Sequence, residues 1–186
     1  AYEQVMLWIG AGLRPLIEGA LQACSIHKSE YHVNFYSQRF LGYYEQNPTQ
    51  FSQLYPYTRT LLNKLKISTK TLSICSNKPE KSVFRVLQEY DLLSVFDYIS
   101  GGDTFAVNKP SAEHIFLTNP EINSDNYHQC VMIGDSSSDI DAAANAGIDS
   151  ILVGYGYLND DHVKQRATYF CESLHEVDLI IKGEIR

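Results

Sequence analysis

The sequence has few cysteines and histidines, and neither residue type is spaced for metal binding. Its 186 residues include four cysteines, and no two of them form a C-x-x-C pair. No two of the six histidines are four residues apart, so a histidine-based metal site is not expected. Cys75 and Cys130 lie in apolar, strand-like runs, where a thiol behaves as a small hydrophobic group. These features favour a reducing, cytoplasmic setting.

Long apolar runs and basic stretches are missing as well. No apolar stretch approaches the length of a membrane span, and no secretory signal is visible, so no membrane partner is expected. The net charge is −7 and the basic residues are scattered, which argues against a nucleic-acid partner. A small anionic ligand would therefore be held by a few well-placed side chains. The sequence gives no indication of an oligomeric state.

Alternating helical and strand-like segments begin at Tyr55. Hydrophobic residues make up 44% of the chain, enough for a core. Strands are predicted at 71–75, 96–100, 130–133, 150–153 and, weakly, 169–171. Helices are predicted at 58–66 and 79–90, from about 111, from among the serines at 136–138, at a short segment after 157 and from about 173. This pattern predicts an α/β fold with a doubly wound parallel sheet.

The first part of the chain differs from the rest. Residues 1–47 are helical in pattern, with interruptions at Gly10, Gly12 and Pro15. We therefore predict a small helical domain over 1–54 and an α/β core over 55–186. Aromatic side chains recur at helical spacing within 29–46, and we expect this stripe to be a buried packing surface. Its members are Tyr31, Phe35, Phe40, Tyr43 and Tyr44.

The run Val131–Gly134 ends in a carboxylate, Asp135, and an alanine-rich helical pattern follows the serines after it. Asp135 and Asp139 are four residues apart, so they can converge on one side of the first helical turn. Two carboxylates beside hydroxyls and backbone N–H groups suit Mg²⁺. The alternative is an acidic helix start in which these residues only cap N–H groups.

Two other predicted strand ends carry polar groups. Ser76 follows the strand at 71–75 and precedes a helix that starts near Pro79. Its hydroxyl and the N–H groups after it either bind an anion or form a simple N-cap. Lys109 precedes Pro110 and a predicted helix, and either points into the crevice or is solvated. Because parallel strands bring their carboxyl ends to one edge of a sheet, we expect Ser76, Lys109 and the two aspartates to surround one pocket.

This order of serine, lysine and Gly-Asp resembles the haloacid dehalogenase-like hydrolase superfamily, in particular its phosphoglycolate phosphatase-like members. Ser76 stands at the family's second motif, Lys109 at its third, and Gly134-Asp135 with Asp139 at its fourth. Residues 8–14 resemble the start of the family's helical cap domain, and residues 154–157 resemble a loop common among phosphoglycolate phosphatases. The resemblance covers essentially the whole chain. It implies a Rossmann-like core with a small helical cap.

The resemblance also implies an activity, the hydrolysis of small phosphorylated metabolites, with phosphoglycolate as the first candidate substrate. The reaction would pass through an aspartyl-phosphate and would use Mg²⁺. Ser76 and the N–H of Asn77 would hold phosphoryl oxygens, and Lys109 would neutralise their charge. Asp135 would reach Mg²⁺, and Asp139 would hold a metal-bound water or orient Lys109.

Arg14 is a weaker candidate, for binding a substrate carboxylate, and a surface arginine is an equally good interpretation.

The family's first motif, an apolar strand that ends in Asp-x-Asp-Gly-Thr and supplies the nucleophile, is not found. Asp139-Ile140-Asp141 belongs to the fourth motif, and Asp160-Asp161 lies in a polar segment. In the family this strand lies between those ending at Ser76 and Asp135. Without it, two interior edges carry unpaired backbone groups, each costing about 1 kcal/mol or more when buried. We therefore expect this chain to belong to a longer polypeptide, or another segment to fill the gap.

Two other functions stay open on the same scaffold. One is a catalytically inactive relative that binds phosphate and metal without the nucleophile. The other is a dehalogenase or phosphosugar mutase, which the Gly-Asp-x-x-x-Asp spacing and the Gly-Tyr-Gly-Tyr loop make less favoured.

Overall fold

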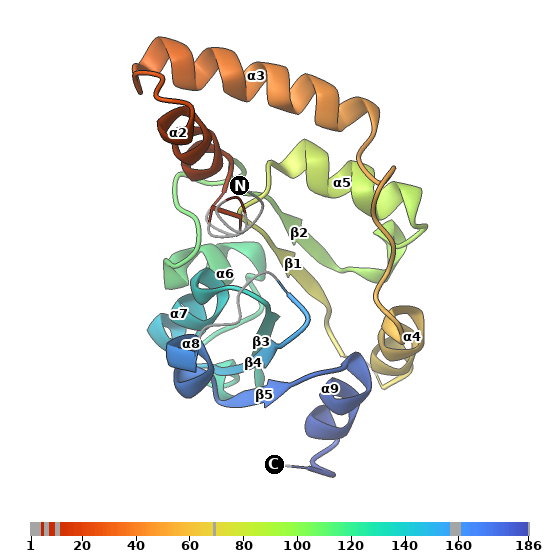
Figure 1. The fold of residues 1–186 in the computed structure, drawn as a ribbon. Helices are drawn as coiled ribbons and strands as arrows, with labels where there is room; N and C mark the ends of the chain where they lie inside the picture. Colours follow the sequence, from red (N-terminus) through yellow and green to blue (C-terminus); the bar gives the residue numbers. More distant parts are fainter. Residues whose placement is uncertain (1–4, 6–7, 10–11, 69, 157–160, 186) are drawn as a thin grey trace.

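The computed structural model describes residues 5, 8–9, 12–68, 70–156 and 161–185, and its parallel strands have helices on both sides (Figure 1). Three strands form one parallel sheet in the order β3 (Val131–Gly134), β4 (Asp149–Val153) and β5 (Tyr169–Cys171). Two more, β1 (Ser73–Cys75) and β2 (Tyr98–Ser100), pair in parallel. The predicted α/β fold with parallel strands is confirmed.

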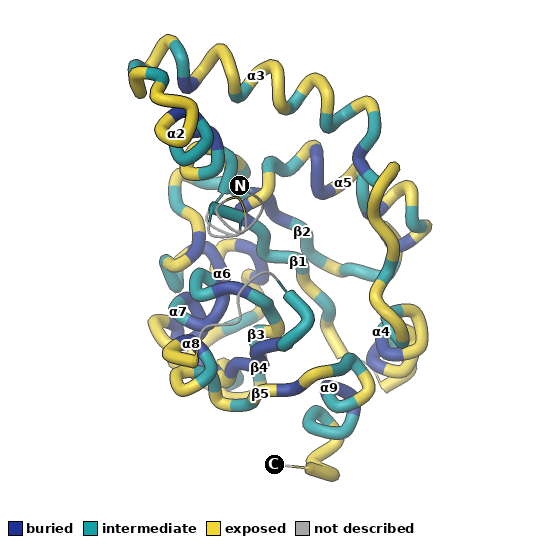
Figure 2. Tube along the Cα trace, in the orientation of Figure 1, coloured by how far each residue is buried: buried dark blue, intermediate teal, exposed yellow. Residues whose placement is uncertain are grey.

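The strand β4 shows why the core is layered. Ile151 and Val153 belong to a cluster with α4 (Thr58–Ile67) and α9 (Leu174–Ile181). Leu152, between them, packs with α7 (Ser137–Ala146) and α8 (Asp161–Arg166). Successive side chains of a strand point to opposite faces, so a strand covered on both faces is apolar throughout. Figure 2 shows β4 as buried.

The remaining helices complete the two layers. Helix α5 (Glu80–Glu89) packs on β1 and β2 through Val83 and Leu87. Helix α6 (Ala112–Thr118) contacts β1, β2 and α7. Short 3₁₀ turns at Leu93–Val95 and Tyr127–Gln129 precede β2 and β3.

A break separates the two groups of strands. Within the described residues, β1 pairs only with β2, and β3 pairs only with β4. Val131 and Ile133 of β3 are each 37% exposed, whereas Ile151 and Leu152 of β4 are fully buried. The break lies between the strands that end before Ser76 and Asp135, where the sequence predicts a missing central strand.

Helices α2 (Leu13–Ala23) and α3 (Glu30–Gln46) pack against each other beside the core (Figure 1). Their contact is a separate small cluster of Ile17, Leu21 and Val33. This separate cluster supports the division into two domains, which stays a prediction. Pro15 lies in the first turn of α2, where its missing N–H removes no helical hydrogen bond. Gly10 lies outside the described residues.

The expectation that the aromatic stripe of α3 is buried is wrong. Tyr31 is 71% exposed and Tyr43 66% exposed, and Phe35 and Phe40 are also exposed. Helix α3 is mostly exposed in Figure 2. The physical reason is that, among the described elements, α3 has its main contacts with α2 and α5, and Val33 is the side chain that fills the contact with α2.

A polar cluster ties α9 to α4. Asp178 is 2% exposed and accepts hydrogen bonds from Lys64 Nζ at 2.6 Å and from Tyr57 Oη at 2.9 Å. Lys182 Nζ lies 3.3 Å from its other oxygen. The hydrogen bond from Lys64, followed by those from Tyr57 and Lys182, lowers the pKa of Asp178 to about 2.

Candidate functional site

Lys109 joins the two sides of the break at the carboxyl edge of the strands. Its Nζ donates to the carbonyl oxygen of Cys75, the last residue of β1, at 2.5 Å. It also donates to Asp139 Oδ1 at 2.5 Å, and both side chains of this pair are 8% exposed. A buried ammonium needs such partners, because desolvation of an unpaired charge is very unfavourable. The ammonium therefore has a fixed position between β1 and α7.

Asp139 lies in the first turn of α7 and uses both carboxylate oxygens. Oδ2 accepts hydrogen bonds from Asp135 N at 3.2 Å, Ser136 N at 3.0 Å and Ser136 Oγ at 2.6 Å. A negative charge is favourable at a helix N-terminus. A Cβ on Gly134 would lie 2.3 Å from Asp139 Cγ, so only glycine allows this packing. These contacts match the orienting one of the two roles implied for Asp139, and its assignment stays a prediction.

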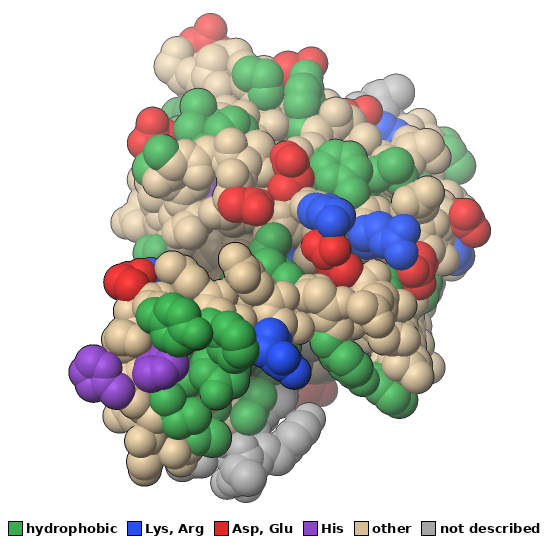
Figure 3. Space-filling model, turned by 90° about the horizontal axis from the view of Figure 1, so that it is seen from above, with side chains coloured by type: hydrophobic (Ala, Val, Ile, Leu, Met, Phe, Trp, Pro, Cys, Tyr) green, Lys and Arg blue, Asp and Glu red, His purple; other side chains and the backbone are tan. Residues whose placement is uncertain are grey.

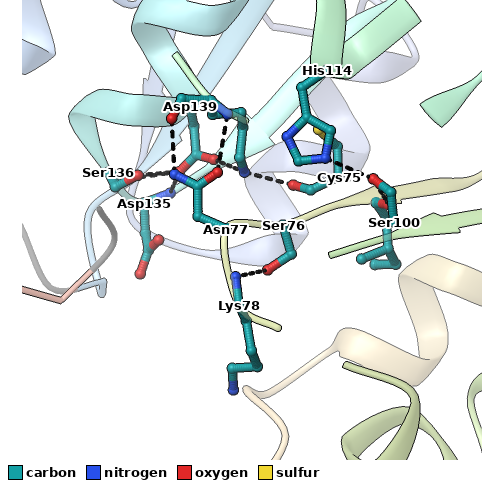
Figure 4. Close-up of polar contacts among 11 residues, drawn as sticks. Cys75, Ser76, Asn77, Lys78, Ser100, His114, Asp135, Ser136 and Asp139 are labelled. Carbon is teal, nitrogen blue, oxygen red and sulfur yellow. Dashed lines mark hydrogen bonds and ion pairs between the residues drawn. The ribbon is translucent and has the colours of Figure 1, made fainter. Parts of the chain in front are cut away.

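Asp135 is positioned differently from the prediction of two converging carboxylates. Its backbone N–H binds Asp139, but its carboxylate points away from Asp139 (Figure 4). Gly156 lies against it, since a Cβ there would be 2.1 Å from Asp135 Cβ. The loop at 154–156 therefore reaches the predicted site, and Tyr157 lies outside the described residues. The carboxylates diverge because Asp135 precedes the helix that Asp139 caps.

The loop after β1 is bound to Lys109 through Asn77. The Asn77 side chain donates to Lys109 O and accepts from Lys109 N, both at 3.0 Å. Ser76 Oγ accepts from Lys78 N at 3.2 Å, so the hydroxyl lies at the turn into α5. These bonds place the loop of Ser76 and Asn77 next to Lys109. Figure 4 shows Asn77 beside Asp139.

Arg14 lies on the surface of α2. Its Nε donates to Glu18 at 2.7 Å and its Nη2 to Glu30 at 2.5 Å. The hydrogen bond to Glu30 is the main cause of a raised Arg14 pKa. These ion pairs match the surface-arginine interpretation. Its role in substrate binding stays a prediction.

Sequence reasoning missed three buried polar residues next to this site: Ser100, His114 and Thr118. His114 Nε2 lies 3.0 Å from Ser100 Oγ, and Ser100 Oγ lies 2.6 Å from Thr118 Oγ1. Burial, and then the charge of Lys109, lower the pKa of His114. A usable signal was present, because His114 and Thr118 are four residues apart and so share one face of a helix.

A resident Mg²⁺ is implied by the resemblance, and the donors can be tested against it. No group of three or more His, Cys, Asp or Glu side chains suited to a metal occurs among the described residues. Mg²⁺ is commonly held by one or two carboxylates, with water and substrate phosphate as the other ligands. Asp135 fits as one such carboxylate, since its side chain is directed away from Asp139 (Figure 4).

The face seen from above mixes charges of both signs. Lys and Arg side chains lie next to Asp and Glu side chains near its middle (Figure 3). No broad basic field is present on this face. None of the helices in the described part of the chain has the length and apolarity needed to cross a bilayer.

Comparison with known proteins identifies the family. Residues 14–153 match the model of haloacid dehalogenase-like hydrolases. The chain belongs to the haloacid dehalogenase-like hydrolase family. It is 34% identical to a phosphoglycolate phosphatase of Aliivibrio fischeri over 87% of this chain and 72% of that protein. It is 32% identical to one of Colwellia psychrerythraea over 94% of this chain and 79% of that protein.

The fold of a solved family structure is also similar. A crystal structure of a predicted phosphoglycolate phosphatase from Haemophilus somnus covers 100% of this chain with a TM-score of 0.83, and 83% of that protein is matched at 24% identity. The prediction of a phosphoglycolate phosphatase-like member of the family is confirmed, and with it the prediction of a hydrolase related to phosphatases.

Proposed function

We propose that this chain provides the phosphate-binding and charge-compensating groups of a phosphatase for small phosphorylated metabolites, with phosphoglycolate as the first candidate. The main support for this proposal is the buried Lys109 ammonium, which is held between Cys75 O and Asp139 Oδ1 where β1 and β3 end. Phosphoryl transfer depends mostly on positioning and on compensation of negative charge. Relatives named phosphoglycolate phosphatases support the choice of substrate.

In this proposal the phosphoryl group lies between Lys109 and the loop after β1. The Ser76 hydroxyl and the backbone N–H of Asn77 bind its oxygens, because the Asn77 side chain is already used to hold Lys109. Lys109 neutralises the charge, and Asp139 orients the ammonium by accepting its hydrogen bond. The N-terminus of α5 adds a favourable dipole close to Ser76.

Asp135 would hold Mg²⁺, which when bound adds positive charge next to the phosphate. We expect chelation with EDTA to abolish phosphate release and Mg²⁺ to restore it. Activity that survives thorough chelation would contradict this assignment.

The nucleophile of this proposal is a carboxylate that lies outside the chain, on a strand between β1 and β3. Two observations support this: the unpaired edges of β1 and β3 in the described structure, and the partly exposed Val131 and Ile133. Parallel strands in such sheets are normally covered by neighbours. A strand in the break would end beside Lys109, because Lys109 bonds to groups on both sides of it.

The experiment is phosphate release from a panel of phosphorylated metabolites by the protein as its gene encodes it. We expect Lys109→Ala and Asp135→Ala each to lower the rate about 100-fold or more. Lys81→Ala and Asp161→Ala, which alter exposed ion pairs, are matched controls and should keep the rate. Retained activity in both site variants would overturn the assignment.

The alternative of an inactive, phosphate-binding relative is favoured by one observation, the lack of Asp-x-Asp after an apolar strand. It predicts that the unaltered protein binds inorganic phosphate but releases none from any ester. Failure of both binding and release would exclude both functions.

A further inference from the structure

A buried polar cluster of Ser100, His114 and Thr118 lies next to the end of β1. His114 is 0% exposed, Ser100 1% and Thr118 5%. Figure 4 shows the His114 ring beside Cys75, with its bond to Ser100. Neither the family motifs nor the proposed function uses this cluster, and its histidine is titratable.

The hydrogen bonds determine which nitrogen of His114 carries the proton. Thr118 Oγ1 donates its single proton to His114 O at 2.6 Å. Ser100 Oγ has one proton and two acceptors in reach, Thr118 Oγ1 at 2.6 Å and Ile74 O at 3.5 Å, and the much shorter contact makes Ser100 the donor to Thr118. Ser100 Oγ then accepts from His114 Nε2 at 3.0 Å. The ring is the neutral Nε2–H tautomer, and its buried Nδ1 has no hydrogen-bond partner in the described structure.

The cluster connects both phosphate-binding elements of the proposed site. Ser100 O accepts from Ser76 N at 3.1 Å, which fixes the start of the loop after β1. His114 and Thr118 belong to α6, which begins three residues after Lys109. Ser100 thus joins the two elements: its backbone oxygen bonds to the segment carrying Ser76, and its hydroxyl bonds to the helix following Lys109.

We propose that His114 is a positioning residue. Its Nε2–H bond to Ser100 holds α6, and with it the backbone next to Lys109, against the strand end that carries Ser76, so that the Lys109 ammonium and the Ser76 hydroxyl face one phosphate. This inference rests on the proposed function, because it assigns the two groups to one phosphate. A neutral donor suits the place: a second positive charge, buried near Lys109, would repel the ammonium.

Three variants separate positioning from packing. His114→Gln keeps an N–H donor that reaches the place of Nε2, whereas His114→Leu removes it at similar volume. Ile115→Ala is the matched control for destabilised packing, since Ile115 is 5% exposed on the same helix but belongs to a separate apolar cluster.

The main readout is affinity for inorganic phosphate, measured by NMR titration of the full protein. We expect His114→Leu to weaken binding at least fivefold, His114→Gln to stay within twofold of the unaltered protein, and Ile115→Ala to keep the affinity although it lowers the melting temperature. Unchanged affinity in His114→Leu would overturn the proposal. Equal losses in His114→Leu and Ile115→Ala, or no rescue by His114→Gln, would do so as well.

Two NMR measurements do not depend on phosphate binding. Nitrogen-15 spectra of the His114 ring should show a protonated Nε2 and an unprotonated Nδ1, and the opposite tautomer would contradict the deduction. The Lys109 ammonium signal should be protected from exchange in the unaltered protein and in His114→Gln, but not in His114→Leu. If the unaltered protein binds no phosphate, the proposed function fails, and the Lys109 signal still decides whether His114 positions the ammonium.

Discussion

At the scale of single residues, the buried ion pair of Lys109 and Asp139 links the two groups of strands. The Lys109–Asp139 pair is buried and connects two segments that β-pairing does not connect among the described residues. Removing one partner of a buried pair leaves the other charge poorly compensated. The pair therefore contributes to stability as well as to the proposed chemistry.

We expect Lys109→Met to lower the free energy of unfolding by about 3 kcal/mol, because the Asp139 carboxylate loses its cationic partner. The control is Lys81→Met, which breaks the surface pair with Glu45 and should cost less than about 1 kcal/mol. Urea unfolding monitored by circular dichroism gives both values. Equal costs would show that the Lys109 pair is solvated in solution.

Asp178 gives a pH-dependent prediction. Its pKa is about 2 in the folded protein against an ordinary value of 3.8, so the unfolded chain binds a proton first as the pH falls. The contribution of Asp178 is fully present above about pH 4 and is lost as the pH falls towards 2. Asp178→Asn should flatten this part of the stability curve, measured by urea unfolding between pH 2 and 5. An identical slope in the variant would contradict the assignment.

At the scale of elements, helix α3 shows how far a periodic pattern can predict burial. Its aromatic spacing predicts a helix, and the helix runs over Glu30–Gln46 with Ser29 as its N-cap. The same spacing does not tell whether another element covers the aromatic face. Val33, outside that stripe, is the residue that is buried.

Two substitutions in this helix should therefore differ strongly in their effect on the free energy of unfolding. Val33→Ala should lower the free energy of unfolding by about 2 kcal/mol, because it leaves a cavity against α2. Tyr31→Ala should change it by less than about 0.5 kcal/mol, since Tyr31 is 71% exposed. Thermal and urea unfolding of the two variants make the comparison. A larger cost for Tyr31→Ala would mean that another surface covers the stripe in solution.

At the scale of the whole molecule, much of the organisation follows from local pattern. The apolar strands at 130–133 and 150–153 and the helix after the serines are seen as β3, β4 and α7. That Lys109 and Asp139 lie close together can also be predicted from the sequence, because parallel strands bring their carboxyl ends together. The direction of the Asp135 carboxylate and the Ser100 cluster depend on tertiary contacts, which sequence spacing does not contain.

The break in the sheet predicts a gradient of amide protection. Strand β4 has a neighbour on each side and is buried, whereas β1 has one neighbour among the described strands. Amides of Ile151 and Leu152 should exchange slowest with deuterium, and that of Cys75, whose carbonyl faces the break and bonds to Lys109, should exchange much faster. Hydrogen exchange with mass spectrometry or NMR measures this in the 186-residue chain. Equal protection of Cys75 and Ile151 would show that β1 is covered on its second side.

The bridge that Lys109 makes between Cys75 O and Asp139 has a consequence for engineering. It places a positive charge at the end of the break between β1 and β3, whose facing edges are unpaired among the described residues. A short synthetic peptide with an acidic end could be tested there as an added strand that pairs with both edges. Fluorescent labels on the peptide and on the exposed thiol of Cys24 would turn its capture into an optical signal.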